Sequence, residues 1–288
     1  MLNLKYHIVS LVAVFCALGI GIFVGSNLVG NDFFVDQQKQ LVTKLEEEFN
    51  FLREQNKLTQ DELAVFKDTT DDYRLFCEQV FPLIIADKLN QKTFAVIELA
   101  PTGINEKVIK TLNEAGAEVA YLAVIDWEVE PDWDLLVSPE EKEPLSKKER
   151  FTRLSQEITG LLISGQDTST LQELRKSGFL TIEGSPGRKV DGVVVLEGSD
   201  EDRSEVFNNF DLAVTNAYTD KGIKVVVGEC QDVLYSTLDA FKLRPVTTID
   251  NIDSTIGLTS LVFSLQGQQG NYGTGNTADR LIPEVNAN

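Results

Sequence analysis

Residues 6 to 31 contain no Asp, Glu, Lys or Arg, and this charge-free run constrains the chain more than any other feature. Its strongly apolar part covers residues 8–29, and roughly 20 helical residues suffice to cross a bilayer core. The run predicts an uncleaved transmembrane helix over residues 8–30, preceded by a lead of residues 1–7. A cleaved signal peptide, with its shorter apolar region, stays open as an alternative. A lipoprotein signal is a second alternative, although Cys16 lies mid-run behind the bulky Phe15.

The charges that flank this run predict its orientation. Lys5 and the chain amine lie on the N-terminal side, whereas Asp32 and Asp36 follow on the C-terminal side. Cytoplasmic flanks are enriched in positive charge, so we expect the N-terminus to be cytoplasmic. The remaining chain is then extracytoplasmic, and the protein is a single-pass protein of the cell membrane.

Small residues recur at every fourth position of the predicted transmembrane helix. Ala13 and Ala17 precede Gly21 and Gly25, and the two glycines form a GxxxG pair. Such a stripe allows two helices to approach closely in lipid. Because Gly and Ala are common in transmembrane helices, the stripe indicates self-association only in combination with the segment that follows.

Residues 31–75 show a heptad pattern, and no Gly or Pro occurs between Gly30 and Pro82. Most core positions from residue 42 to residue 66 are apolar, and their neighbours are polar or charged. This pattern predicts a coiled-coil stalk of roughly five heptads. The predicted a positions are Val42, Phe49, Asn56, Leu63 and Thr70, and the d positions are Leu45, Leu52, Thr59, Phe66 and Tyr73.

Two features of the heptads favour a parallel homodimer. Asn56 is the polar residue at an a position, a placement that fixes register and favours two strands. The pairs Glu48–Arg53 and Glu62–Lys67 carry opposite charges at g and e′ positions. The alternative is an amphipathic helix that packs on its own globular domain. The predicted dimer interface comprises Gly21, Gly25, Val42, Leu45, Phe49, Leu52, Asn56, Leu63 and Phe66.

Residues 90–266 alternate between short apolar runs and amphipathic segments, which predicts a three-layer α/β domain with a mostly parallel sheet. The run TFAVIEL at 93–99 is a predicted buried strand, and a helix near 105–115 connects it to a second strand. A Gly- and Asn-rich tail occupies residues 267–288 and docks either on this domain or on a partner. The predicted strands are 93–99, 118–125, 134–137, 161–163, 179–182, 192–196 and 223–228. The predicted helices are 105–115, 146–158, 168–177, 203–217, 230–242 and 254–265.

The formal net charge of the 288-residue chain is -19, which bears on its partners. An acidic surface repels nucleic acid and anionic lipid headgroups. We therefore predict no nucleic-acid partner. The acidity is compatible with basic partners or cations, and equally with a soluble acidic surface.

The sequence contains none of the common catalytic motifs. It lacks the GxGxxG and GxxxxGK[ST] phosphate loops and the GxSxG elbow. The single histidine, His7, lies at the membrane edge, which removes His-based triads from the exported domain. Asp126, at the end of the second strand, occupies a position where α/β ligand sites form, but a structural role is the simpler interpretation. We predict no catalytic residue, no cofactor and no enzymatic activity, with an α/β enzyme that lacks a recognisable site as the alternative.

Both ends of the chain resemble the MctB family, which is named after a mycobacterial copper transport outer-membrane protein. The opening is similar to the family pattern HxVSLxAVFxALxxGxxxGS, and the ending is similar to its YG motif and closing Leu/Ile-Pro. The positions that match in the opening are His7, Val9, Ser10, Leu11, Ala13, Val14, Phe15, Ala17, Leu18, Gly21, Gly25 and Ser26. The matching positions in the ending are Tyr272, Gly273, Ala278, Leu281 and Pro283.

The resemblance implies a role in copper efflux or tolerance, or an envelope protein that acts with a protein partner. Soft Cu(I) prefers Cys and Met sulfur, and Cu(II) prefers imidazole. Beyond the membrane run the chain has no Met or His and only Cys77 and Cys230, whose pairing in a disulfide stays open. We therefore expect a dimeric, membrane-anchored scaffold that binds an envelope protein partner, with a direct role in copper efflux as the alternative.

Overall fold

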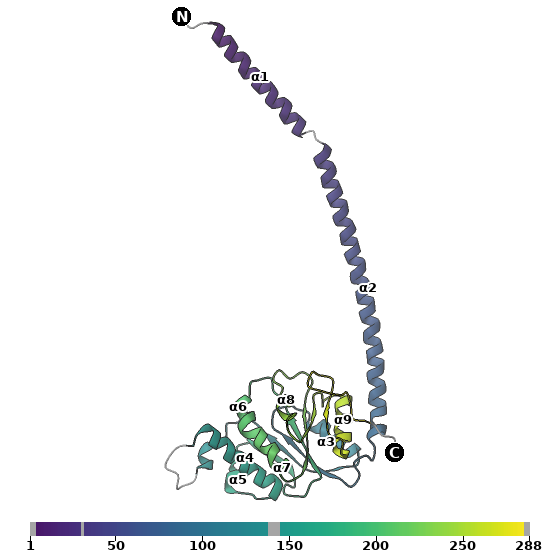
Figure 1. The fold of residues 1–288 in the computed structure, drawn as a ribbon, viewed down its shortest axis with the longest axis vertical. Helices are drawn as coiled ribbons and strands as arrows, with labels where there is room; N and C mark the ends of the chain where they lie inside the picture. Colours follow the sequence, from purple (N-terminus) through teal and green to yellow (C-terminus); the bar gives the residue numbers. More distant parts are fainter. Residues whose placement is uncertain (1–3, 30–31, 138–144, 285–288) are drawn as a thin grey trace. The chain divides into compact units, whose positions relative to one another are not determined.

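The computed structural model describes residues 4–29, 32–137 and 145–284. The chain divides into two compact units, Met1–Tyr73 and Arg74–Asn288. Figure 1 shows helices α1 and α2 in the first part of the chain and a mixed α/β domain in the second.

Helix α1 (Leu4–Val29) is mostly apolar, and Lys5 is its one charged residue at neutral pH. Its segment Lys5–Asn27 is long and apolar enough to cross a membrane by length and composition. At 1.5 Å per residue its 23 residues extend about 35 Å, slightly more than a typical hydrocarbon core. Membrane association through α1 is therefore compatible with the described structure.

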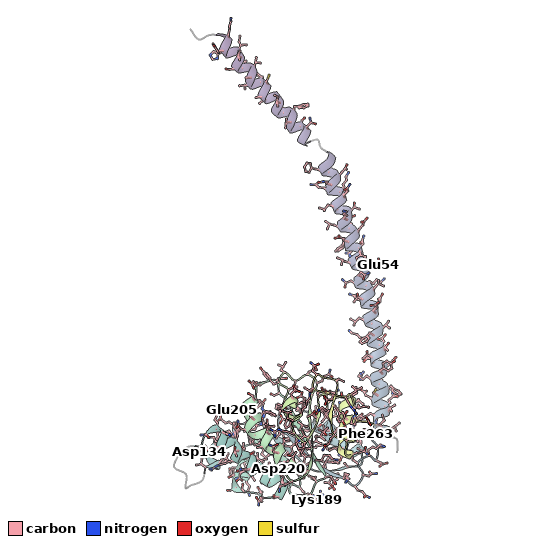
Figure 2. The ribbon with its side chains drawn as sticks, in the orientation of Figure 1. Glu54, Asp134, Lys189, Glu205, Asp220 and Phe263 are labelled. Carbon is pink, nitrogen blue, oxygen red and sulfur yellow. The ribbon has the colours of Figure 1, made fainter. Side chains whose placement is uncertain are left out.

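Helix α2 (Asp32–Ile85) contains 54 residues and extends about 80 Å. It continues ten residues beyond the predicted end of the stalk at residue 75. Pro82 lies in the last turn of α2, so only three helical residues follow its ring. The Ala86 N–H donates to the Pro82 carbonyl at 3.1 Å. Figure 2 shows side chains, Glu54 among them, projecting along the length of α2.

The α/β domain is built on a seven-stranded sheet with the order β3-β2-β1-β4-β5-β6-β7. All neighbouring pairs are parallel except β2 and β3, which are antiparallel. The strands are β1 (Thr93–Glu98), β2 (Glu118–Ile125), β3 (Leu180–Gly184), β4 (Gly192–Glu197), β5 (Lys224–Glu229), β6 (Thr247–Ile249) and β7 (Asn271–Tyr272). The predicted α/β class with a mostly parallel sheet is confirmed.

Helices cover both faces of the sheet, which explains why its central strands are apolar at consecutive positions. Ala95 and Ile97 face one apolar core, together with residues of α4, α5 and α7, whereas Phe94 and Val96 face the second core with α3 and α9. Figure 1 shows these helix groups on opposite sides of the sheet. The helices are α3 (Asn105–Glu114), α4 (Lys147–Ser164), α5 (Ser169–Lys176), α6 (Ser204–Val206), α7 (Leu212–Thr219), α8 (Leu238–Phe241) and α9 (Thr255–Gln266).

Two of the predicted strands are wrong. Residues 134–137 fall largely in a 3₁₀ turn, η1 (Trp133–Leu136), which the Asp132 carboxylate caps by accepting from the Asp134 N–H at 3.1 Å. Residues 161–163 lie inside α4. Leu161 and Leu162 continue the spacing of Leu154 and Ile158 on the buried face of that helix, so their apolar run follows the helical period.

Two short strands and one loop were not predicted. Strand β6 has three residues and β7 has two, too few to give a pattern of alternation. The predicted helix at 230–242 is wrong over most of its length, because only α8 is helical there. The preceding residues form a loop in which Tyr235 bridges to Ser199.

The C-terminal segment docks on its own domain, one of the two alternatives expected from the sequence. Strand β7 pairs in parallel with β6, and Tyr272 is buried. The Asp250 carboxylate accepts from the Thr274 N–H at 2.9 Å and from the Thr277 hydroxyl at 3.1 Å. Gly273 has φ +138°, and a Cβ there would collide with the Asp250 carboxylate. The YG motif therefore closes this turn.

We predict that Asp250→Ala loosens the C-terminal segment. The substitution removes a buried carboxylate that accepts two hydrogen bonds, from the Thr274 N–H and the Thr277 hydroxyl, and their loss costs about 1–3 kcal/mol. Amide hydrogen exchange of residues 271–283 measures the effect, and we expect faster exchange there. The exposed Asp232→Ala is the matched control. Unchanged exchange in Asp250→Ala would show that strand pairing alone holds the segment.

Candidate binding cavity and stalk interface

Three neighbouring parallel strands each end in a buried glutamate. Glu98 ends β1, Glu197 ends β4 and Glu229 ends β5, and each is no more than 3% exposed. Because β1, β4 and β5 are adjacent and parallel, the three carboxyl groups lie along one edge of the sheet. A row of buried acids at this edge is costly unless each finds partners.

The same edge contains the topological switch point of the sheet. From β1 the chain proceeds to β2 on one side, and later returns to β4 on the other side of β1. In open parallel sheets, ligands bind outside the carboxyl ends of the strands where the order reverses. The topology of the sheet therefore predicts a ligand site at the carboxyl ends of β1 and β4.

Glu98 is fully engaged by its own loop. Its carboxylate accepts from the Thr102 N–H and hydroxyl at 2.8 and 2.7 Å, from the Gly103 N–H at 2.8 Å, and from the Asn105 amide. The group therefore holds the loop between β1 and α3. Asp126 also has a structural role, because its carboxylate accepts from the Glu128 N–H at 2.9 Å in a turn after β2.

Glu229 is engaged by the loop before α8. Its carboxylate accepts from the Ser236 hydroxyl at 2.5 Å and from the Thr237 N–H at 3.3 Å. Burial raises the pKa of Glu229 to about 7, and these two hydrogen bonds oppose the shift. Glu229 thus fixes the loop that forms one wall of a cavity.

This cavity has a volume of about 310 Å³ and opens beside the carboxyl end of β4. Its walls come from the loop after β4, from the start of the α6–α7 region, and from the loop that contains Tyr235 and Thr237. Arg203 connects the cavity to β1, because its Nη2 donates to the Leu99 carbonyl at 2.9 Å and its guanidinium lies 5.5 Å from the Trp127 ring centre. The cavity thus lies at the switch point.

Polar atoms without hydrogen-bond partners are concentrated in this cavity. Among the described residues, seven buried side-chain oxygen or nitrogen atoms lack a partner, and five of them belong to residues that line it. They are both carboxylate oxygens of Asp211, Oε1 of Glu197, Nε of Arg203 and Oγ1 of Thr237. The nearest cation to Asp211 is Arg203, whose Nη2 lies 3.7 Å from Oδ2, beyond hydrogen-bonding distance.

Glu197 and Asp211, the two acids with oxygens that lack a partner, are each 1% exposed. Burial raises the pKa of Asp211 to about 7, and the positive charge of Arg203 opposes the shift. Burial also raises the pKa of Glu197 well above its usual value, and the nearby charge of Asp211 raises it further. The pair therefore holds a proton up to near-neutral pH.

Asp211 ends a single π-helical turn, η2 (Phe207–Asp211), between α6 and α7. The Asn208 and Asn209 amides donate to the carbonyls of Ser204 and Glu205 on the outer side of this turn. Such turns occur often at functional sites because they redirect side chains. The predicted continuous helix at 203–217 did not include this change, and Glu197, Arg203 and Asp211 were not predicted. The only sequence signal was an acid at the end of each apolar strand.

The residues predicted for the dimer interface lie on α1 and α2, within the unit Met1–Tyr73. The six apolar predicted positions of α2 are Val42, Leu45, Phe49, Leu52, Leu63 and Phe66, and half or more of each side chain is exposed. On α1, a Cβ added at Gly21 or Gly25 would meet nothing within 4 Å. The guanidinium of Arg53, predicted to pair with Glu48 of a second chain, lies 4.3 Å from the Phe49 ring centre.

Cysteine thiolates and carboxylates are the candidate metal ligands of the α/β domain. Cys16, Cys77 and Cys230 are free thiols. Burial raises the pKa of Cys230 to about 11, which disfavours the metal-binding thiolate. Within residues 4–29, 32–137 and 145–284, no group of three or more His, Cys, Asp or Glu side chains is arranged to hold a metal ion.

An apolar N-terminal helix, a long polar helix with one apolar stripe, and an α/β domain together define a class of protein suited to association with a membrane. A family model described as copper transport outer membrane protein, MctB, matches residues 1–283, and the chain belongs to this MctB family. A comparison with curated proteins finds no match. The family description supports a copper transport-related envelope protein.

We predict that Asp211→Asn reduces the loss of stability with rising pH. The raised pKa of Asp211 means that the native state binds more protons than the unfolded chain between about pH 4 and 7. The stabilisation is therefore present below pH 4 and is lost as the pH rises through about 7. Wild type therefore loses about 1–3 kcal/mol more of its free energy of unfolding between pH 4 and pH 8 than Asp211→Asn does.

Urea denaturation of both full-length proteins at the two pH values measures this difference. Asp220→Asn is the control, because Asp220 is exposed at the end of the same helical region (Figure 2) and loses the same charge. An equal pH dependence in Asp211→Asn and wild type would show that Asp211 is ionised in the native protein at every pH tested.

Proposed function

We propose that the chain is a homodimeric, membrane-anchored envelope protein that acts as a non-enzymatic scaffold. In this proposal α1 crosses the membrane with its N-terminus in the cytoplasm, α2 forms a parallel coiled coil, and the α/β domains bind an envelope protein partner. The observation that carries the proposal is the row of exposed apolar side chains on α2.

The energetics of this row support a second copy of the chain as its occupant. Burying apolar surface stabilises by about 25 cal/mol per Å², so a seam of large side chains repeated over several heptads is sufficient for association. Val42, Leu45, Phe49 and Leu52 alternate at spacings of three and four residues, as the knobs of a two-stranded coiled coil do. Asn56 in the same row favours a parallel pair in register.

The membrane helix is consistent with the same arrangement. In lipid there is no hydrophobic drive between helices, so close approach depends on small residues. The backbone at Gly21 and Gly25 is open, and these glycines lie on the helix that precedes the stalk. Two copies joined along α2 would bring their α1 helices together at the membrane.

We predict that Asn56→Cys forms a disulfide-linked dimer in intact membranes when Cys16, Cys77 and Cys230 are replaced by serine. In a parallel coiled coil the two a positions at residue 56 face each other, within reach of a disulfide. Asp61→Cys is the matched control, because residue 61 is an f position on the outside. Non-reducing electrophoresis measures the dimer fraction. Equal crosslinking at both positions, or none at residue 56 in folded protein, contradicts the parallel stalk.

A direct role in copper efflux is the second candidate, favoured by the family description. We predict no binding of Cu(I) or Cu(II) tighter than about micromolar to the full-length protein, because soft ligands are few and dispersed. Equilibrium dialysis in detergent measures the binding. Tighter binding that is lost in Cys77→Ser or Cys230→Ser would support copper carriage instead of the scaffold.

A further inference from the structure

We propose that the cavity beside the carboxyl end of β4 binds a small organic cation, through a primary ammonium group that contacts Asp211 and Glu197. The scaffold role described above does not require this site, so either conclusion can stand without the other. The argument rests on the unpartnered buried acids, on the charge of the walls and on the size of the cavity.

The unpartnered atoms define what a ligand must supply. Both oxygens of Asp211 and Oε1 of Glu197 are acceptors without donors, although the two side chains are 99% buried. A buried carboxylate without hydrogen bonds is among the most costly groups in a protein. An ammonium group carries three N–H donors and a positive charge, so one such group can bind both carboxylates.

The walls of the cavity favour a cation over an anion. Five acidic side chains and one basic side chain line it, namely Glu197, Glu201, Asp202, Asp211, Asp239 and Arg203. A hydrogen bond from Ser204 lowers the pKa of Asp202, so this acid is ionised at neutral pH. The guanidinium of Arg203 donates to the Leu99 carbonyl and lies 3.7 Å from Asp211 Oδ2, so its single positive charge offsets one of the five acids.

A metal cation fits the cavity less well than an organic cation. No group of three or more potential ligands is found among the described residues, and hard cations require six or more oxygen ligands. The volume of about 310 Å³ is at the lower end of the range for small-molecule sites. Phe207 and Tyr235 also line the cavity and offer apolar surface to a short alkyl chain.

Isothermal titration of the full-length protein in non-ionic detergent with cadaverine tests the proposal. 1,5-Pentanediol is the matched control ligand, since it has the same chain length but no charge. We expect binding of cadaverine at pH 8 and at least tenfold weaker binding of the diol. Asp211→Asn weakens cadaverine binding at least tenfold, whereas the exposed Asp220→Asn leaves it within about twofold of wild type.

The pH dependence provides a readout that does not need a variant. The charged groups that face Asp211 and Glu197 are Arg203 and Glu229, with Glu201, Asp202 and Asp239 at the rim of the cavity. Because Asp211 has a pKa of about 7, cadaverine must displace its proton, and affinity increases roughly tenfold from pH 6 to pH 8. Glu197→Gln replaces Asp211→Asn if the latter does not fold.

The outcomes separate the possible occupants. Stronger binding of Nα-acetyl-lysine amide than of cadaverine supports the ammonium site and identifies its source as a lysine side chain. Stronger binding of 1,5-pentanediol than of cadaverine overturns the proposal in favour of a neutral hydroxyl ligand. No binding of any of these compounds also overturns it, and the cavity then contains only water.

Discussion

Burial of the sheet on both faces is the constraint on which the α/β domain depends. A strand that is covered on both sides has no place for a charged side chain along its length, so polar groups are confined to its ends. In this domain β1, β4 and β5 each end in glutamate at the same edge. Glu98 and Glu229 find donors in the loops that follow them, and these two loops are ordered by that requirement. Glu197, by contrast, has no hydrogen-bond donor for Oε1. The cavity lies beside this strand end, where the carboxylate is not fully hydrogen-bonded.

Sequence patterns identified the parts of the structure that depend on local composition. The charge-free run of α1, the part of α2 up to residue 75 and the strands β1, β2, β4 and β5 follow from hydropathy and its period over six or more residues. The short strands β6 and β7 depend instead on contacts across the chain, such as the bonds from Thr274 and Thr277 to Asp250. No local pattern of two or three residues encodes such contacts, which is why both strands were absent from the prediction.

The cavity could not be predicted for a related reason. Glu197 and Asp211 are 14 positions apart, and their proximity depends on how α7 packs against the sheet and on the π turn at Phe207–Asp211. One extra residue in a helical turn changes which face a side chain occupies, and hydropathy does not register it. Helix α2 is the opposite case: its apolar stripe is visible in the sequence, and its side chains are exposed in the single chain. These side chains become buried only if a second copy of the chain, or another partner, packs against α2.

Helix α2 and the cavity pose different energetic questions. Any partner that covers the exposed apolar side chains of α2 would explain them. Without a partner, their exposure to water has only a modest free-energy cost. The buried acids of the cavity have no such simple account, because apolar residues of similar volume in place of a buried ionic cluster are often neutral or stabilising. Leu or Met in place of Asp211 and Glu197 would therefore stabilise the fold at least as well. Conflicts of this kind between local chemistry and stability are concentrated at functional sites. The buried acids at the sheet edge are thus the stronger reason to expect a ligand, and the exposed apolar stripe of α2 is the stronger reason to expect a second chain.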